Sequence, residues 1–153
     1  MLHTINQALR EMSSPKPKVL IAEVPRVIPV VEDAWHGYFD LTFCTTMQEA
    51  QRLLQEPFDV IVCGTHFADS NMFDLLRHAK ASPQACETPF LCVRVLDGEL
   101  DETAFQGISM AAKALAAAGF IDVNRWRREY GFDGARTKLR QLVFDLAGVE
   151  HLV

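Results

Sequence analysis

The sequence predicts a three-layer α/β fold, in which helices cover both faces of a doubly wound, five-stranded parallel sheet. Five short apolar runs are spaced along the chain, and each is followed by apolar residues at helical spacing. Alternation of this kind is typical of parallel sheets with helical crossovers. The chain has 153 residues, of which 49% are hydrophobic and 23% charged, and this composition suits one compact domain.

We expect residues 1–17 to form an N-terminal leader helix and linker, and residues 18–153 to form the domain. The break at residues 13–17 contains two prolines, which end the helical periodicity before it. The apolar positions that define that periodicity are Leu2, Ile5, Leu9 and Met12.

The first half of the domain predicts two strands and two helices. Residues 18–24 are almost continuously apolar, as in a strand covered on both faces, whereas residues 39–44 alternate as in a strand nearer an edge. Thr46 and Glu49 have the spacing of a capping box at the start of the second helix. The apolar faces of the two helices are Val27, Ile28, Val31, Trp35 and Tyr38, then Met47, Ala50, Leu53 and Leu54.

The second half continues the alternation with strands at residues 60–63, 90–95 and 119–123. Asp69 or Ser70 is predicted to cap the helix after the third strand. The right-handed crossover rule leaves few topologies, and the flavodoxin-like order 2-1-3-4-5 is the expected one. The helical faces are Met72, Leu75, Leu76 and Ala79; Phe105, Ile108, Ala112 and Leu115; and Ala135, Leu139, Leu142, Val143 and Leu146.

The net charge of -5 and the pI near 5.5 argue against a nucleic-acid-binding protein. No apolar run approaches the roughly 18 residues of a membrane span, and the start lacks the layout of a signal peptide, so we expect a cytoplasmic protein. The four cysteines form no C-x-x-C pair and are expected to be buried, reduced thiols. No glycine-rich phosphate loop follows the first strand, and we expect no cofactor.

Residues 58–73 resemble the third strand and following loop of a response-regulator receiver (CheY-like) domain, and the resemblance extends over residues 18–148. It implies that the phosphoacceptor aspartate of the family falls on Gly64. It further implies that the remaining pocket positions are altered. The two acidic positions fall on Glu23 and Val24, the hydroxyl position on Arg94, the lysine position on Val123 and the switch aromatic on Phe120.

These replacements remove the chemistry that the resemblance would otherwise imply. Glycine offers no nucleophile, one glutamate is a weak anchor for Mg²⁺, and valine cannot neutralise a phosphoryl group. The resemblance therefore implies a degenerate pseudo-receiver that is not an enzyme, has no catalytic residue and binds no metal. We expect a protein–protein interaction module in bacterial-type signal transduction. Its partners would be a histidine kinase, a regulator or output protein, or a second copy bound through the face formed by helix 4, strand 5 and helix 5.

The main alternative is a small-ligand sensor that uses the space vacated at Gly64, with hydrogen bonds from Thr65, His66 and Asn71. An enzyme of flavodoxin-like fold is a further alternative. We also expect Arg94 either to form an ion pair with Glu23 or to point to solvent.

Two other patterns have weaker chemical readings. Cys63 and His66 could form a nucleophilic pair, and His66 with Asp69 could bind a metal, although a structural thiol is the simpler interpretation. A basic and aromatic segment follows the fifth strand, in a connection predicted to be a solvated turn. It is also a possible partner surface or, less favoured, a single-strand nucleic-acid site. Its candidate residues are Trp126, Arg127, Arg128 and Tyr130.

Overall fold

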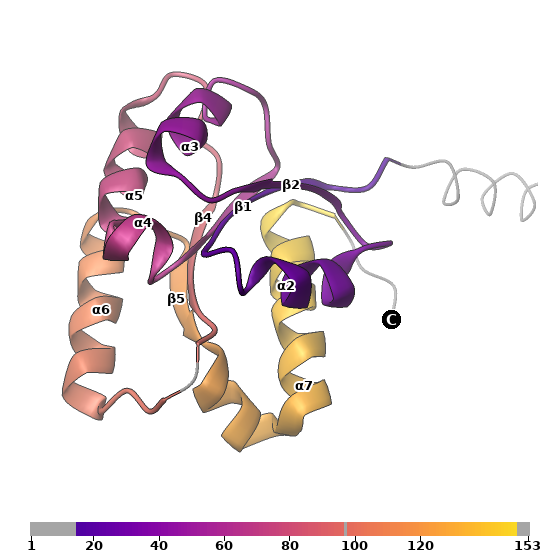
Figure 1. The fold of residues 1–153 in the computed structure, drawn as a ribbon, viewed down its shortest axis with the longest axis vertical. Helices are drawn as coiled ribbons and strands as arrows, with labels where there is room; N and C mark the ends of the chain where they lie inside the picture. Colours follow the sequence, from indigo (N-terminus) through magenta and orange to yellow (C-terminus); the bar gives the residue numbers. More distant parts are fainter. Residues whose placement is uncertain (1–14, 97, 150–153) are drawn as a thin grey trace, which may run out of the picture.

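The computed structural model describes residues 15–96 and 98–149, so the leader helix expected before residue 15 lies outside the described residues. Figure 1 shows a central sheet with helices on both sides. The sheet is parallel and has five strands in the order β2-β1-β3-β4-β5, which confirms the predicted topology. The strands are β1 (Lys18–Ala22), β2 (Asp40–Cys44), β3 (Val60–Gly64), β4 (Phe90–Arg94) and β5 (Gly119–Asp122).

Six helices complete the three layers of the described chain. One face of the sheet carries α3 (Met47–Leu53), α4 (Phe67–Ser70), α5 (Met72–Ala81) and α6 (Glu102–Ala114), and the other carries α2 (Ile28–Trp35) and α7 (Val123–Leu146) (Figure 1). Alternate side chains of β1 pack into the cores on opposite faces of the sheet. Leu20 packs with α3, α5 and α6, whereas Ile21 packs with α2 and α7. Both faces of the strand are therefore buried, as its apolar run predicts.

The helix starts agree only partly with the sequence prediction. Thr46 caps α3 as expected, because its hydroxyl accepts a hydrogen bond from the backbone N–H of Glu49 at 3.2 Å. Asp69 and Ser70 do not cap α5. They have positive φ values of 59° and 67°, and α5 begins only at Met72. Phe67 is fully buried, and the chain turns back from it through these left-handed residues.

The segment after β5 is helical, so the predicted solvated turn is wrong. β5 ends at Asp122, and α7 begins at Val123. The reason lies in Asp122, whose carboxylate accepts a hydrogen bond from the backbone N–H of Asn124 at 3.2 Å and so caps the helix. Gly131, with φ 78° and ψ 171°, then divides α7 into two halves, residues 123–130 and 132–146.

The described cysteines are free thiols, and Cys44, Cys63 and Cys92 are buried. Burial raises the pKa of Cys44 and of Cys92 to about 12. In the part of the chain that the structure describes, no helix combines the length and apolar character needed to cross a bilayer.

Candidate functional site

The candidate site lies where four parallel strands end at the same edge of the sheet. Gly64 and Arg94 are the last residues of β3 and β4, Asp122 is the last residue of β5, and Glu23 follows β1 directly. The strand register pairs Gly64 with Val93 and Arg94 with Asp122. Ligands of open α/β sheets bind at this edge, so these residues lie where such sheets have their binding sites.

The carboxyl group of Glu23 fills the space next to Gly64. A Cβ atom placed on residue 64 would lie 2.0 Å from Oε2 and 2.2 Å from Cδ of Glu23, closer than real Cβ contacts. The Glu23 residue is only 5% exposed, and its Oε1 accepts a hydrogen bond from the backbone N–H of Val24 at 2.9 Å. The space that the sequence predicted to be vacant is therefore taken by another side chain.

Burial changes the chemistry of that carboxyl group. Desolvation raises the pKa of Glu23 from 4.5 to about 7, and the hydrogen bond from Val24 opposes this rise only in part. Among the described residues, no lysine, arginine or histidine forms an ion pair with it. Glu23 thus exchanges its proton close to neutral pH.

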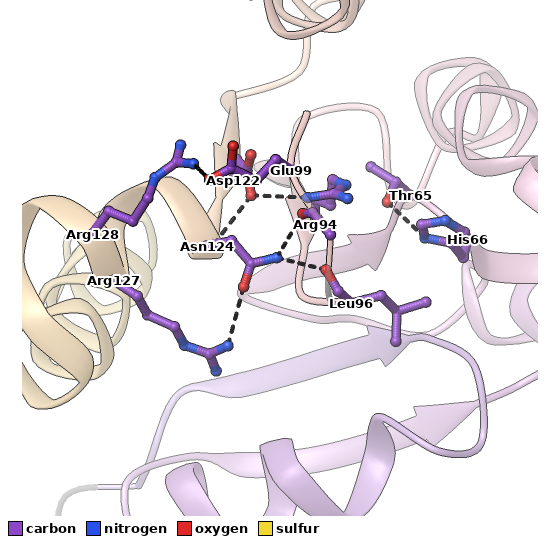
Figure 2. Close-up of polar contacts among 10 residues, drawn as sticks. Thr65, His66, Arg94, Leu96, Glu99, Asp122, Asn124, Arg127 and Arg128 are labelled. Atoms are coloured by element: carbon purple, nitrogen blue, oxygen red, sulfur yellow. Dashed lines mark hydrogen bonds and ion pairs between the residues drawn. The ribbon is translucent and has the colours of Figure 1, made fainter. Parts of the chain in front are cut away.

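Arg94 pairs with Asp122, so the predicted ion pair with Glu23 is wrong. Figure 2 shows Arg94 and Asn124 converging on Asp122. The guanidinium Nη1 lies 3.4 Å from Asp122 Oδ1, and the two residues are 8% and 3% exposed, which also excludes a solvent-facing Arg94. The physical reason is the register of β4 and β5, which places the two residues side by side.

Asp122 and Asn124 are site residues that the sequence prediction missed. Asp122 accepts from both Arg94 and the backbone N–H of Asn124, and the side-chain amide of Asn124 donates to the carbonyl of Leu96 at 2.6 Å (Figure 2). These bonds join the ends of β4 and β5 to the start of α7. The available signal was an aspartate at the last position of a buried strand, in front of a helix.

The other predicted positions are apolar contacts. Val123 is buried at the first position of α7, and Phe120 is buried against Phe105 with ring centroids 5.7 Å apart. Arg125 stacks over the same Phe105 ring at 4.0 Å. The two positions that the resemblance matched to the family's lysine and switch aromatic are therefore both buried, apolar side chains.

The residues present do not fit the magnesium ion that the resemblance would imply. Mg²⁺ requires several hard oxygen ligands in octahedral array. Within residues 15–96 and 98–149, no three His, Cys, Asp or Glu side chains gather closely enough to hold a metal. Glu23 is the one carboxylate among the predicted positions, with Val24 beside it and Gly64 opposite.

Polar side chains of the loop after β3 form hydrogen bonds within the loop. The hydroxyl of Thr65 lies 3.2 Å from Nδ1 of His66, and Asn71 donates its amide to the carbonyl of Ala68 at 2.7 Å (Thr65 and His66 in Figure 2). Cys63 is fully buried, and desolvation raises its pKa well above the ordinary value, so the thiolate needed for a nucleophile is disfavoured.

A cavity lies on the face of the sheet that α2 and α7 cover, between the sheet and these two helices. Its volume is about 70 Å³, and most of its walls are aliphatic side chains such as Val31, Val62 and Leu139. Glu23 and Gly64 also line it, together with the cationic residues Arg127 and Arg136 of α7. The site therefore combines a buried acid, an apolar cavity and two arginines.

The predicted partner residues lie on the first half of α7 and differ in exposure. Trp126 and Arg127 are half-buried, whereas Arg128 and Tyr130 are exposed. Arg128 forms an ion pair with Glu99 (Figure 2). The rings of Trp126 and Tyr130 pack edge to face, with their centroids 6.4 Å apart. Lys138, on the second half of α7, lies over both of these rings at about 5 Å.

No protein-family model and no curated protein sequence matches the chain. Solved structures do. A response regulator from Hahella chejuensis is 15% identical, with a TM-score of 0.66 over 90% of this chain and 100% of that one. The receiver domain of a Pseudomonas aeruginosa sensor histidine kinase, solved with magnesium in its active-site cleft, is 15% identical, with a TM-score of 0.65 over 87% and 98%. A chemotaxis response regulator of Vibrio cholerae is 17% identical, with a TM-score of 0.62 over 84% and 98%. The chain therefore has the CheY-like receiver fold.

Proposed function

We propose that the chain is a pseudo-receiver that cannot be phosphorylated and acts as a protein–protein interaction module in bacterial-type signal transduction. The observation that supports it best is the Glu23 carboxyl group beside Gly64. A receiver that transfers phosphate needs a nucleophile there and room for the incoming group. In this chain the position has no side chain, and the space is occupied.

The surrounding contacts favour one fixed conformation. Arg94 and Asp122 form a buried ion pair that ties β4 to β5, and Phe120 is enclosed by Phe105. Because Gly64 supplies no nucleophile, we infer neither a catalytic role nor a phosphorylation switch. Output would then depend on surface contacts with other proteins, in a cytoplasmic two-component or related pathway.

The partner surface that we propose is the face formed by α6, β5 and the first half of α7. Tyr130 and Met110 are 48% and 69% exposed on this part of the molecule, and Trp126 and Arg128 lie near Tyr130 on the same helix. Tryptophan, tyrosine and arginine contribute most of the binding energy at many interfaces. A histidine kinase, a regulator or a second copy of the chain would dock there.

Incubation with acetyl phosphate and Mg²⁺ tests the first part of the proposal. Intact mass should show no phosphoryl adduct, whereas an active receiver treated in parallel should gain one. Because an acyl phosphate is labile, the first spectrum is recorded promptly. A second spectrum is recorded after treatment with hydroxylamine, which cleaves acyl phosphates. A hydroxylamine-sensitive adduct on any carboxylate would contradict the proposal.

Affinity capture with a matched pair of variants tests the second part. Trp126→Ala combined with Tyr130→Ala should reduce capture of the native partner at least about tenfold, as expected for interface anchors. Arg77→Ala, an exposed change on α5, is the control and should leave capture unchanged. Sedimentation velocity of the same variants shows whether the partner is a second copy. Equal capture by all variants would exclude this face.

A further inference from the structure

The cavity between α2 and α7 has a cationic wall that forms no ion pair with a described acidic group. Arg127 and Arg136 line the cavity from the two halves of α7. Neither lies within the 4.0 Å ion-pair distance of a described carboxylate. The Nε of Arg127 is buried and has no hydrogen-bond partner in the described structure. Buried donors of charged groups normally find a partner, so this N–H is free to donate to a bound acceptor.

The same two guanidinium groups lie near one aromatic ring, that of Phe132. The Cζ atoms of Arg127 and Arg136 lie 5.0 and 5.8 Å from the centre of the Phe132 ring. The Nη1 of Arg127 also donates to Asn124 Oδ1 at 3.3 Å. Gly131 makes this arrangement possible, because its positive φ turns the chain between the two halves. Two like charges therefore lie next to one ring on one side of an apolar cavity.

The size of the cavity limits what the apolar part of a ligand can be. A single water molecule needs roughly 10–15 Å³ on the same volume scale, so about 70 Å³ holds on the order of five non-hydrogen atoms. Aliphatic walls such as Val31, Val62 and Leu139 favour a hydrocarbon chain over a polar group.

Glu23 is the third ionisable residue that lines the cavity, and its charge would oppose an anion. Because burial raises its pKa to about 7, the neutral acid is the main form in mildly acidic solution. The ionisable side chains that face the cavity are thus two permanent cations and one acid that can be neutral.

We propose that this cavity binds a short aliphatic monocarboxylate, with its hydrocarbon chain between α2 and the sheet and its carboxylate on Arg127 and Arg136. Guanidinium groups bind carboxylates through charge-assisted hydrogen bonds, which gives the arginines a function that their lack of acidic partners leaves open. This inference does not rest on the proposed protein contacts, and its failure would leave them untouched.

Calorimetric titration of the full chain at about pH 6 with acetate, butyrate, hexanoate and decanoate tests this inference, because Glu23 is then mostly neutral. Butyrate or hexanoate should bind saturably and raise the melting temperature, because a ligand of the folded state stabilises it. Acetate should bind more weakly because it leaves the cavity unfilled, and decanoate because it exceeds it. Hexanol, which has the chain without the charge, should bind at least about tenfold more weakly than hexanoate.

Variants of equal size then locate the site. Arg127→Met and Arg136→Met should each weaken hexanoate binding about tenfold or more. Arg140→Met is the matched control, since Arg140 also has a buried unpartnered Nε and stacks on an aromatic ring, Tyr38, but does not line the cavity. Ala34→Leu should abolish binding by filling the cavity. Equal binding of hexanol and hexanoate, equal loss in Arg140→Met, or no binding by any acid would each overturn the inference.

Discussion

At the scale of single residues, Glu23 is a buried acid without a cationic partner among the described residues, and its effect on stability depends on pH. Its pKa is about 7 in the folded state and near 4.5 in the unfolded state, so the folded state binds the proton more tightly. Stability from this group is fully present below pH 4.5, falls as the pH rises towards 7, and stays low above it. The loss amounts to about 3 kcal/mol at most.

Glu23→Gln should therefore leave stability nearly unchanged at about pH 4 and raise it by up to about 3 kcal/mol at about pH 8. Glutamine keeps an oxygen for the Val24 N–H but carries no charge. Urea unfolding at several pH values measures the difference. Glu56→Gln, at an exposed glutamate, is the control and should not alter the pH profile. A variant that is less stable than the wild type at the higher pH would show that ionised Glu23 has an unidentified partner.

Gly64 and Glu23 share one space, and their energies should be coupled. Gly64→Ala should destabilise the fold by roughly 1–3 kcal/mol, because its Cβ meets the Glu23 carboxyl group at 2.0 Å. In the Glu23→Ala background the same change should cost much less, giving a coupling of about 1 kcal/mol or more in a double-mutant cycle. Strict additivity would mean that the carboxyl group can leave this position freely.

Asp122→Asn tests how much the buried ion pair between Arg94 and Asp122 contributes to stability. Asparagine retains the helix cap for α7 but leaves the Arg94 charge uncompensated, so we expect a loss of about 3–5 kcal/mol. The loss should shrink in the double variant with Arg94→Met. Asp101→Asn, an exposed cap on α6, is the control and should be nearly neutral. If Asp122→Asn lost no more stability than the control Asp101→Asn, the ion pair would contribute little.

At the scale of elements, α7 depends on one glycine. Gly131 has φ 78° and ψ 171°, a conformation available almost only to glycine, and it lets the two halves of the helix pack against each other. Gly131→Ala should destabilise the protein by about 1–3 kcal/mol and weaken the contacts of Lys138 with Trp126 and Tyr130. A change in the tryptophan emission spectrum and a lower melting temperature, each compared with the wild type, would report these effects.

Gly107→Ala provides the opposite case within the same protein. Gly107 is exposed inside α6, and a Cβ there meets nothing within 4 Å. Alanine has the higher helix propensity, so this variant should gain up to about 1 kcal/mol. If both glycine variants lost stability equally, conformational strain at Gly131 would not be the cause.

At the scale of the whole molecule, strand order and most helices could be predicted because hydrophobic periodicity and the crossover rule restrict them strongly. The site was predicted only in part. Sequence placed Glu23, Gly64 and Arg94 at one edge, but the partner of a long arginine depends on the register of β4 and β5, which paired it with Asp122. The first half of α7 escaped prediction because its residues show no apolar stripe. Its start is determined by the Asp122 cap.

That first half of α7 should nevertheless unfold together with the rest of the molecule. Arg125 forms an ion pair with Glu102 of α6 at 3.1 Å and stacks on Phe105, and Lys138 joins Trp126 to the second half. The two tryptophans, Trp35 in the core and Trp126 in this segment, report the two regions separately. In the single-tryptophan variants Trp126→Phe and Trp35→Phe, fluorescence and circular dichroism should each give coincident urea midpoints, as two-state unfolding requires. An earlier fluorescence transition in Trp35→Phe alone would identify residues 123–130 as a separately unfolding unit, and the cavity wall that contains Arg127 would then open before the core does.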